Sequence, residues 1–247
     1  MDTDVKSPEE LKTLLRTEML DDQYESIRKR LIKAGMLERN LIKKGRIKFD
    51  PNKKGKDFIG EGGFGSVYRC SVKGGDTKGK RLVLKSILFN LSTLSGILNE
   101  IKCHMMMNDH PYVVSIRKVC LELFRDNRPE EVSEEYNGYI HLIMDQCDMD
   151  LTEYCAKYFD SGLSDKLDKI FYQVAQALEI VHEKRLIHRD IKPQNVLMVR
   201  SSDSEEESWI PQLADFGIST LLDDLDSDDS KKSLESKRPK STKTVIG

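Results

Sequence analysis

The sequence has little cysteine, few aromatic residues and no long apolar run. Its longest stretch without a charged residue, 86–99, is too short to cross a bilayer. The first residues are acidic and contain no apolar segment of the kind found in secretory signals. The five cysteines are scattered and show no paired Cys-x-x-Cys spacing, which argues against a disulfide framework and a zinc site. We therefore expect reduced thiols, no membrane span and a cytoplasmic location, with the nucleus as the alternative.

The sequence also has no large excess of positive or negative charge overall, because it contains 40 basic and 42 acidic residues and has a net charge of −2. This balance predicts no nucleic-acid partner. The local distribution is uneven: residues 28–56 carry an excess of basic side chains, and residues 201–235 an excess of acidic ones. The basic segment has two interpretations, a solvated helix and linker or a docking surface for an acidic partner, such as the chain's own acidic segments.

The order of the expected elements indicates an α+β fold, with strands first and long helices later. Two low-complexity segments, 201–208 and 223–241, are expected to be loops. Amphipathic helical stretches are expected at 7–19 and 22–35, the second ending near Gly35. The remaining expected elements are a hairpin at 55–72, strands at 81–88, 113–123 and 139–145, and helices at 92–108 and 164–184.

The first motif with chemical content is Gly-x-Gly-x-x-Gly-x-Val, which runs from Gly60 to Val67. Glycines without a Cβ let the backbone approach phosphate groups closely. A dinucleotide-binding loop would open a helix at this point, whereas the residues that follow Gly65 continue as a strand. A glycine-rich hairpin without a ligand is the structural alternative.

A cation and a carboxylate occupy otherwise apolar elements and predict an ion pair. Lys85 lies in an apolar strand, where a buried ammonium group needs a partner. Glu100 interrupts a mostly apolar row of the helix 92–108, and we expect it to supply that partner. A second apolar row on this helix must be covered by something other than the strands; it consists of Leu94, Leu98, Ile101 and Met105.

The strongest signal is the run His188-Arg189-Asp190-Ile191-Lys192-Pro193-Gln194-Asn195, followed by Asp215-Phe216-Gly217. Phosphoryl transfer needs a carboxylate that accepts the proton of the attacking hydroxyl, and oxygen ligands that hold magnesium on the phosphates. Asp190 suits the first role, and Asn195 and Asp215 suit the second. Lys192 is close enough in sequence to neutralise the transferred phosphate.

With these motifs, the chain from Phe58 to Gly247 resembles the eukaryotic protein kinase family, and Asp190-x-Lys192 resembles its serine/threonine branch. The resemblance implies a bilobal fold with an antiparallel five-stranded N-lobe, one main helix in that lobe and an incomplete helical C-lobe. It also implies three parts: a helical and basic extension at 1–56, an N-lobe at 57–147 and a partial C-lobe at 148–247 with the catalytic loop.

The resemblance further implies the ligands and the residues that hold them. ATP and Mg2+ are the expected cofactors, with Asn195 and Asp215 as metal ligands and Asp190, Lys192, Lys85 and Glu100 as catalytic residues. Met144 would precede the hinge that receives adenine. The residues expected to bind ATP are Ile59, Gly60, Glu61, Gly62, Gly63, Phe64, Gly65, Val67, Lys85, Asp145 and Cys147.

Three features depart from the family pattern or extend it. The sequence given stops at Gly247, within the activation segment, so we expect the apolar face of helix 164–184 to lose most of its cover and the isolated chain to be poorly soluble or inactive. His104 stands where relatives carry an apolar residue, either as a core histidine or as a charge-sensitive switch. In the family that this chain resembles, an arginine at the position of Arg189 accompanies regulation by phosphorylation of the activation loop. Thr244 is the candidate for the phosphorylated residue.

Three functional hypotheses follow. The first is an ATP-dependent kinase, or a catalytic fragment of one, that phosphorylates serine and threonine hydroxyls of protein substrates. The second is a nucleotide-binding scaffold, or pseudokinase, without turnover. The third assigns the main role to residues 1–56, as an interaction module that covers the second apolar row of helix 92–108, regulates Glu100 and meets a regulatory partner.

Overall fold

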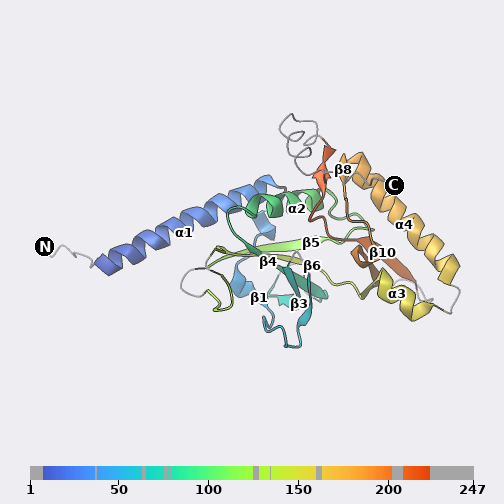
Figure 1. Ribbon diagram of the computed structural model, residues 1–247, viewed down its shortest axis with the longest axis horizontal. Helices are drawn as coiled ribbons and strands as arrows, with labels where there is room; N and C mark the ends of the chain where they lie inside the picture. The colour runs from blue at the N-terminus through green and yellow to red at the C-terminus, as the bar shows by residue number, and fades with distance from the viewer. Residues whose placement is uncertain are drawn as a thin grey trace, which may run out of the picture.

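The core of the protein is a six-stranded antiparallel sheet (Figure 1) in the order β1-β3-β4-β6-β5, with β2 also paired to β3. This computed structural model describes residues 8–36, 38–62, 65–74, 77, 79–124, 128–133, 135–159, 163–201 and 208–222, with side chains from Met19 onward except that of Leu163. The strands are β1 (Ile47–Lys48), β2 (Phe58–Gly62), β3 (Gly65–Val72), β4 (Leu82–Phe89), β5 (Ile116–Leu123) and β6 (Gly138–Asp145).

The five strands expected for residues 57–147 are present as β2 to β6, and the N-terminal extension adds a sixth strand that was not expected. Ile47 and Lys48 pair with Val72 and Ser71 of β3. A two-residue strand is too short to show the alternation that identifies strands in a sequence. Ile47 is buried in a cluster on one face of the sheet, together with Ile42, Tyr68, Leu82, Leu84, Cys120 and Ile143. The extension is therefore part of the core that supports β3 and β4.

The N-terminal helix α1 (Pro8–Lys33) is continuous, although two amphipathic stretches were expected. Residues 19–22 contain neither glycine nor proline, so nothing interrupts the helix between the stretches. The helix ends in a Schellman motif, in which Gly35 N–H donates to Ile32 O and Met36 N–H to Leu31 O. Gly35 has a φ of +98°, which side chains rarely tolerate, and it turns Met36 into the core.

Helix α1 covers the second apolar row of helix α2 (Leu94–Met106), as Figure 1 shows for its C-terminal end. Ile27, Leu31 and Met36 are each almost fully buried. They share one cluster with Leu94, Leu98 and Ile101, with Met105 packed against its edge. The prediction that an element other than the sheet covers this row is confirmed, and that element is the extension. Two 3-10 turns, η1 (Glu38–Asn40) and η2 (Lys44–Arg46), lead from there to β1.

The second half of the chain contains the helices expected for a helical C-lobe, together with short strands that were not expected. Strands β9 and β10 form a hairpin that pairs Val196 with Leu213 and Arg200 with Trp209. Strand propensity depends strongly on the partner strand, so local patterns predict such short strands poorly. The elements are β7 (Met149–Asp150), α3 (Leu151–Tyr158), α4 (Leu163–Glu183), β8 (Leu186–Ile187), η3 (Pro193–Asn195), β9 (Val196–Arg200), β10 (Trp209–Leu213) and β11 (Thr220–Leu221).

The apolar face of α4 is better covered than the sequence suggested. Ile170, Val174 and Val181 are buried in a cluster with residues of α3, β9 and β10. Phe171 and Tyr172 are 55% and 67% exposed. The prediction that this face loses most of its cover is therefore wrong for its buried residues and holds for Phe171. In the part of the chain that the structure describes, no helix is both long and apolar enough to traverse a bilayer.

Candidate active site

The predicted ion pair lies at the centre of the site. Lys85 projects from β4 and its Nζ lies 2.7 Å from Glu100 Oε1 on α2 and 3.4 Å from Asp215 Oδ1. The Lys85 and Glu100 side chains are only 12% and 6% exposed. The burial excludes most of the water that would screen the pair, and each charge compensates the other. The expected pairing of Lys85 with Glu100 is confirmed, and the same ammonium group also reaches Asp215.

Two of the residues predicted to form the catalytic loop, Lys192 and Asn195, contact the Asp190 carboxylate. Lys192 Nζ lies 2.7 Å from Asp190 Oδ2, and Asn195 Nδ2 donates to the same oxygen at 2.9 Å. Asn195 Nδ2 also donates to the Asp190 backbone oxygen at 2.9 Å. The hydrogen bond from Lys192 lowers the pKa of Asp190, with a further contribution from Asn195. Asp190 is thus held as a carboxylate whose position is fixed from two sides.

Backbone contacts join the catalytic loop to the segment that carries Asp215. Ala214 N–H donates to Asn195 O at 2.9 Å, and the His188 Nε2 contacts Ala214 O at 3.0 Å. Because a carbonyl oxygen only accepts, the His188 Nε2 carries the hydrogen. Burial lowers the pKa of His188, so its ring is neutral. Asp215 itself has a φ of +65°, an uncommon conformation for a residue with a side chain. Such outliers often mark functional positions.

Asn195 and Asp215 offer oxygens that fit a magnesium ion. Asn195 uses its amide nitrogen on Asp190, so its Oδ1 points to no hydrogen-bond donor recorded among the described residues. One oxygen of Asp215 accepts from Gly217 N–H at 3.3 Å. No three His, Cys, Asp or Glu side chains gather into a metal site within the described ranges. A hard cation here would therefore rely on this amide, this carboxylate, phosphate oxygens and water, a ligand set that Mg2+ accepts.

The glycine-rich segment forms the expected hairpin between β2 and β3, with Gly60 opposite Val67 and Gly62 opposite Gly65. Val67 in turn lies opposite Lys85. Ile59 is 45% exposed at the edge of the sheet. The predicted ATP contacts Gly63 and Phe64 lie outside the described residues. The hairpin therefore places Gly65 on β3, the strand next to Lys85, and Gly60 and Gly62 on β2, one strand further away.

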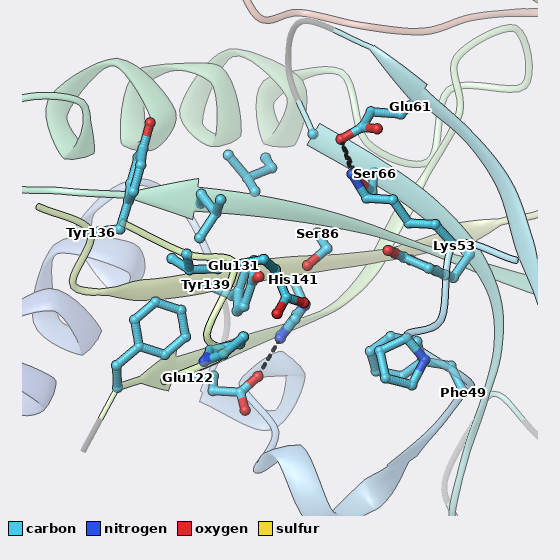
Figure 2. A pocket seen from close by; sticks show the side chains of 18 of the residues that line it. Phe49, Lys53, Glu61, Ser66, Ser86, Glu122, Glu131, Tyr136, Tyr139 and His141 are labelled. Atoms are coloured by element: carbon cyan, nitrogen blue, oxygen red, sulfur yellow. Dashed lines mark hydrogen bonds and ion pairs between the residues drawn. The ribbon is translucent and has the colours of Figure 1, made fainter. Parts of the chain in front are cut away.

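Glu61 is engaged by the extension, as Figure 2 shows. Lys53 Nζ lies 2.5 Å from Glu61 Oε1, and Ser66 Oγ donates to the same oxygen at 3.2 Å. The hydrogen bond from Lys53 lowers the pKa of Glu61. The expected contribution of Glu61 to ATP binding therefore falls on its backbone, because its carboxylate already binds a lysine.

The predicted hinge is fixed by an arginine that the sequence did not single out. Arg117 Nε lies 2.9 Å and 3.1 Å from the two carboxylate oxygens of Asp145. Arg117 NH1 also reaches Asp109 at 3.2 Å. The Cys147 Sγ lies 3.7 Å from Gln212 Oε1, and burial raises its pKa to about 12. Asp145 and Cys147 can thus meet a ligand through backbone groups, since both side chains contact protein.

A cavity of about 1300 Å³ adjoins the site, and Figure 2 shows side chains that line it. Its wall includes Glu100 and Ser66 as well as the aromatic rings of Phe49 and Tyr139. On this wall His141 Nε2 lies 2.8 Å from Glu122 Oε2, and Lys44 binds the same oxygen. Burial opposes the ionisation of Glu122, but the hydrogen bonds from His141 and Lys44 lower its pKa to about 2. The cluster of Lys44, Glu122 and His141 fastens the extension to β5 and β6.

Sequence reasoning missed two positioning residues, Arg117 and Asn99. Asn99 Nδ2 donates to Ser219 O at 3.1 Å and so connects α2 to the start of the activation segment. Neither residue belongs to a motif, and only the folded structure brings them to their partners. Arg189, with a φ of +69°, is exposed. The candidate phosphosite Thr244 lies outside the described residues.

Residues 54–237 match the family model described as "Protein kinase domain". A "Cyclin-dependent kinase 4 homolog" of Caenorhabditis elegans is 30% identical over 167 residues, which cover 65% of this chain and 36% of that protein. "Cyclin-dependent kinase B1-1" of Arabidopsis thaliana is 28% identical over 170 residues, 65% of this chain and 50% of the relative. "Probable serine/threonine-protein kinase iksA" of Dictyostelium discoideum is 27% identical over 174 residues, which cover 68% of this chain and 17% of that protein. The matches span at most half the length of these relatives.

Proposed function

The chain belongs to the protein kinase domain family, and from that premise we propose that it transfers the γ-phosphate of ATP to serine or threonine hydroxyls of proteins. The observation that carries this proposal is the convergence of two distant segments on one site. Lys85, Glu100 and Asp215 form one charged group, and Asp190, Lys192 and Asn195 form the other. The Ala214–Asn195 backbone bond joins them.

Each of these residues has a role that follows from its charge and contacts. Asp190 orients the attacking hydroxyl and accepts its proton, while Lys192 offsets charge on the transferred phosphate. Lys85, held by Glu100, binds phosphate oxygens of the nucleotide under the β2–β3 hairpin. Asn195 and Asp215 would hold magnesium, which when bound neutralises the phosphates and aligns them. The hydroxyl then attacks the γ-phosphorus, the bond to the ADP oxygen breaks, and the proton passes to Asp190.

The choice of serine and threonine over other acceptors rests on two supports. Lys192 lies beside Asp190 and contacts its carboxylate, as the resemblance to the serine/threonine branch implies. Two of the similar proteins are named as serine/threonine kinases, iksA and dst3 of Dictyostelium discoideum. We infer the same acceptor class for this chain.

The test is magnesium-dependent transfer of labelled phosphate from ATP to a mixed serine and threonine peptide library, with Asp190→Asn as the comparison. We expect Asp190→Asn to lower the transfer rate at least about 100-fold, because the general base is lost, and to leave nucleotide affinity within about threefold. Binding of ATP by the wild type without any transfer, in this chain and in a C-terminally extended one, would favour the scaffold hypothesis instead.

A second role, regulation of α2 by the extension, is favoured by the packing of α1. Ile27, Leu31 and Met36 bury the row Leu94, Leu98 and Ile101, which lies on the same helix as Glu100. We propose that α1 holds α2 in the position at which Glu100 reaches Lys85. Ile27→Asp should then weaken ATP binding by several fold, whereas Met19→Asp, at a site 67% exposed, should not. Equal ATP affinity in both variants would exclude this role.

A further inference from the structure

His104 occupies a position on α2 that none of the roles above explains. It lies one helical turn after Glu100 and is only 3% exposed. Its ring lies 5.0 Å, centroid to centroid, from the Phe216 ring, and the His188 ring lies 4.8 Å from the same Phe216 ring. An apolar side chain could fill this space equally well, so packing alone does not account for an imidazole.

The imidazole makes one contact that an apolar side chain cannot make, with the backbone of Val114. His104 Nε2 forms a short hydrogen bond to Val114 O. Because the carbonyl only accepts, Nε2 carries the hydrogen. Burial lowers the pKa of His104 to about 4, so the ring is neutral. Val114 is itself 2% exposed, and no other donor to its carbonyl is recorded among the described residues. Without His104 this buried carbonyl would lack its hydrogen bond.

Val114 is in turn bonded to the strand that leads into Asp215. Val114 N–H donates to Leu213 O at 3.0 Å, and Leu213 N–H donates to Tyr112 O at 2.8 Å. Val113 and Leu213 form a parallel bridge. Leu213 lies two residues before Asp215. The hydrogen bonds therefore run from α2 through His104 and Val114 to the backbone just ahead of Asp215.

This series of hydrogen bonds and the charged group of Lys85, Glu100 and Asp215 both connect α2 to the segment that carries Asp215. Glu100 on α2 reaches Asp215 through Lys85, with distances of 2.7 Å and 3.4 Å. His104 and Val114 provide a second link between the same helix and the same segment. A rotation of α2 that moved Glu100 away from Lys85 would also have to break the bond to Val114.

We propose that His104 is a positioning residue that fixes the rotation of α2 relative to Asp215, through its hydrogen bond to the Val114 carbonyl. The assignment deepens the proposed function, since it concerns the placement of Glu100 and Asp215 for nucleotide binding. The property that matters is a side-chain donor at the position of Nε2. The ring contact with Phe216 is packing that other side chains can provide.

The test compares variants that separate the donor from the packing. His104→Leu keeps an apolar contact with Phe216 and removes the donor, whereas His104→Gln keeps a nitrogen donor at a similar reach. Lys102→Gln, on the exposed side of α2, is the control. Affinity for an ATP analogue with magnesium, KM for ATP, kcat and thermal stability are measured on the whole chain.

We expect His104→Leu to weaken analogue binding and raise KM for ATP by about tenfold or more, and His104→Gln to restore both to within about threefold of wild type. The control should match wild type. Unchanged binding in His104→Leu, or equal losses in the Leu and Gln variants, would overturn the inference. If His104→Leu does not fold, His104→Met carries the same comparison.

The binding measurement keeps this inference separate from the proposed function. A wild-type chain that binds the analogue but transfers no phosphate would refute the kinase proposal. The ratio of affinities between the Leu and Gln variants would still decide the role of His104.

Discussion

Three buried histidines make the stability of the protein depend on pH. Burial lowers the pKa values of His104, His141 and His188. The folded state therefore keeps these rings neutral, while the unfolded chain protonates them near pH 6.5. The unfolded state therefore binds more protons than the folded state below pH 6.5. The contribution of these histidines to the free energy of unfolding is complete above pH 6.5. It is lost as the pH falls from 6.5 toward about 4, the pKa of His104 in the folded state.

We predict that the free energy of unfolding falls by about 2 kcal/mol or more between pH 7.5 and pH 5.5, since one pKa unit corresponds to about 1.4 kcal/mol for each group. Urea denaturation at the two pH values measures this change. His141→Gln should flatten the dependence, and His182→Gln, at an exposed histidine, should not. A stability that is the same at both pH values would contradict the argument.

Among the described glycines of the hairpin, Gly65 has a backbone conformation and surroundings that leave no room for a side chain. It has a φ of +123°, and a Cβ there would lie 2.3 Å from Ser86 O. Gly65→Ala should therefore destabilise the protein by roughly 1–3 kcal/mol and push β3 away from β4. Gly60→Ala is the matched control, because a Cβ at Gly60 meets no atom within 4 Å. Thermal unfolding of both variants checks the prediction, which fails if their midpoints shift equally.

At the scale of elements, the end of α1 decides whether the extension packs on α2. The Schellman motif at Gly35 directs Met36 into the cluster with Leu31 and Ile101. Leu31 and Met36, which the backbone hydrogen bond at the helix end joins, both pack against α2. The conformation of a single glycine determines this geometry.

Gly35→Ala should lower the free energy of unfolding by about 1–2 kcal/mol, the cost of a left-handed backbone at a residue with a Cβ. Gly45→Ala, whose Cβ would meet nothing within 4 Å, should have little effect. Chemical denaturation gives both values. If the two variants prove equally stable, the helix end does not hold the extension in place.

At the scale of the whole molecule, α4 exposes two large aromatic side chains. Phe171 and Tyr172 are neighbours in sequence and mostly exposed. Apolar surface of this kind promotes association between molecules. We predict concentration-dependent self-association of the chain in sedimentation velocity experiments. The double variant Phe171→Ser and Tyr172→Ser should reduce it, whereas Lys169→Ser on the same helix should not. Identical sedimentation of the three proteins would exclude these rings as the cause.

The contacts among the candidate site residues were easier to predict from the sequence than several contacts of the scaffold. Asp190, Lys192 and Asn195 lie within six consecutive residues, so local geometry brings them together once the loop forms. The Lys85–Glu100 pair was predictable because each is a charge in an apolar element. In contrast, β1, β9 and β10 are short strands that form only when each meets its partner strand, which local patterns do not show. The contacts Arg117–Asp145 and His104–Val114 are equally non-local and left no pattern in the sequence.

The burial of the thiols has a practical consequence for labelling chemistry. The pKa values of Cys70, Cys120 and Cys147 are all raised to about 12. At neutral pH these groups hold almost no thiolate, the form that reacts with maleimides. A cysteine introduced at an exposed position such as Met19 would therefore react much faster than these three. A fluorophore attached there would report the movement of α1 relative to the sheet.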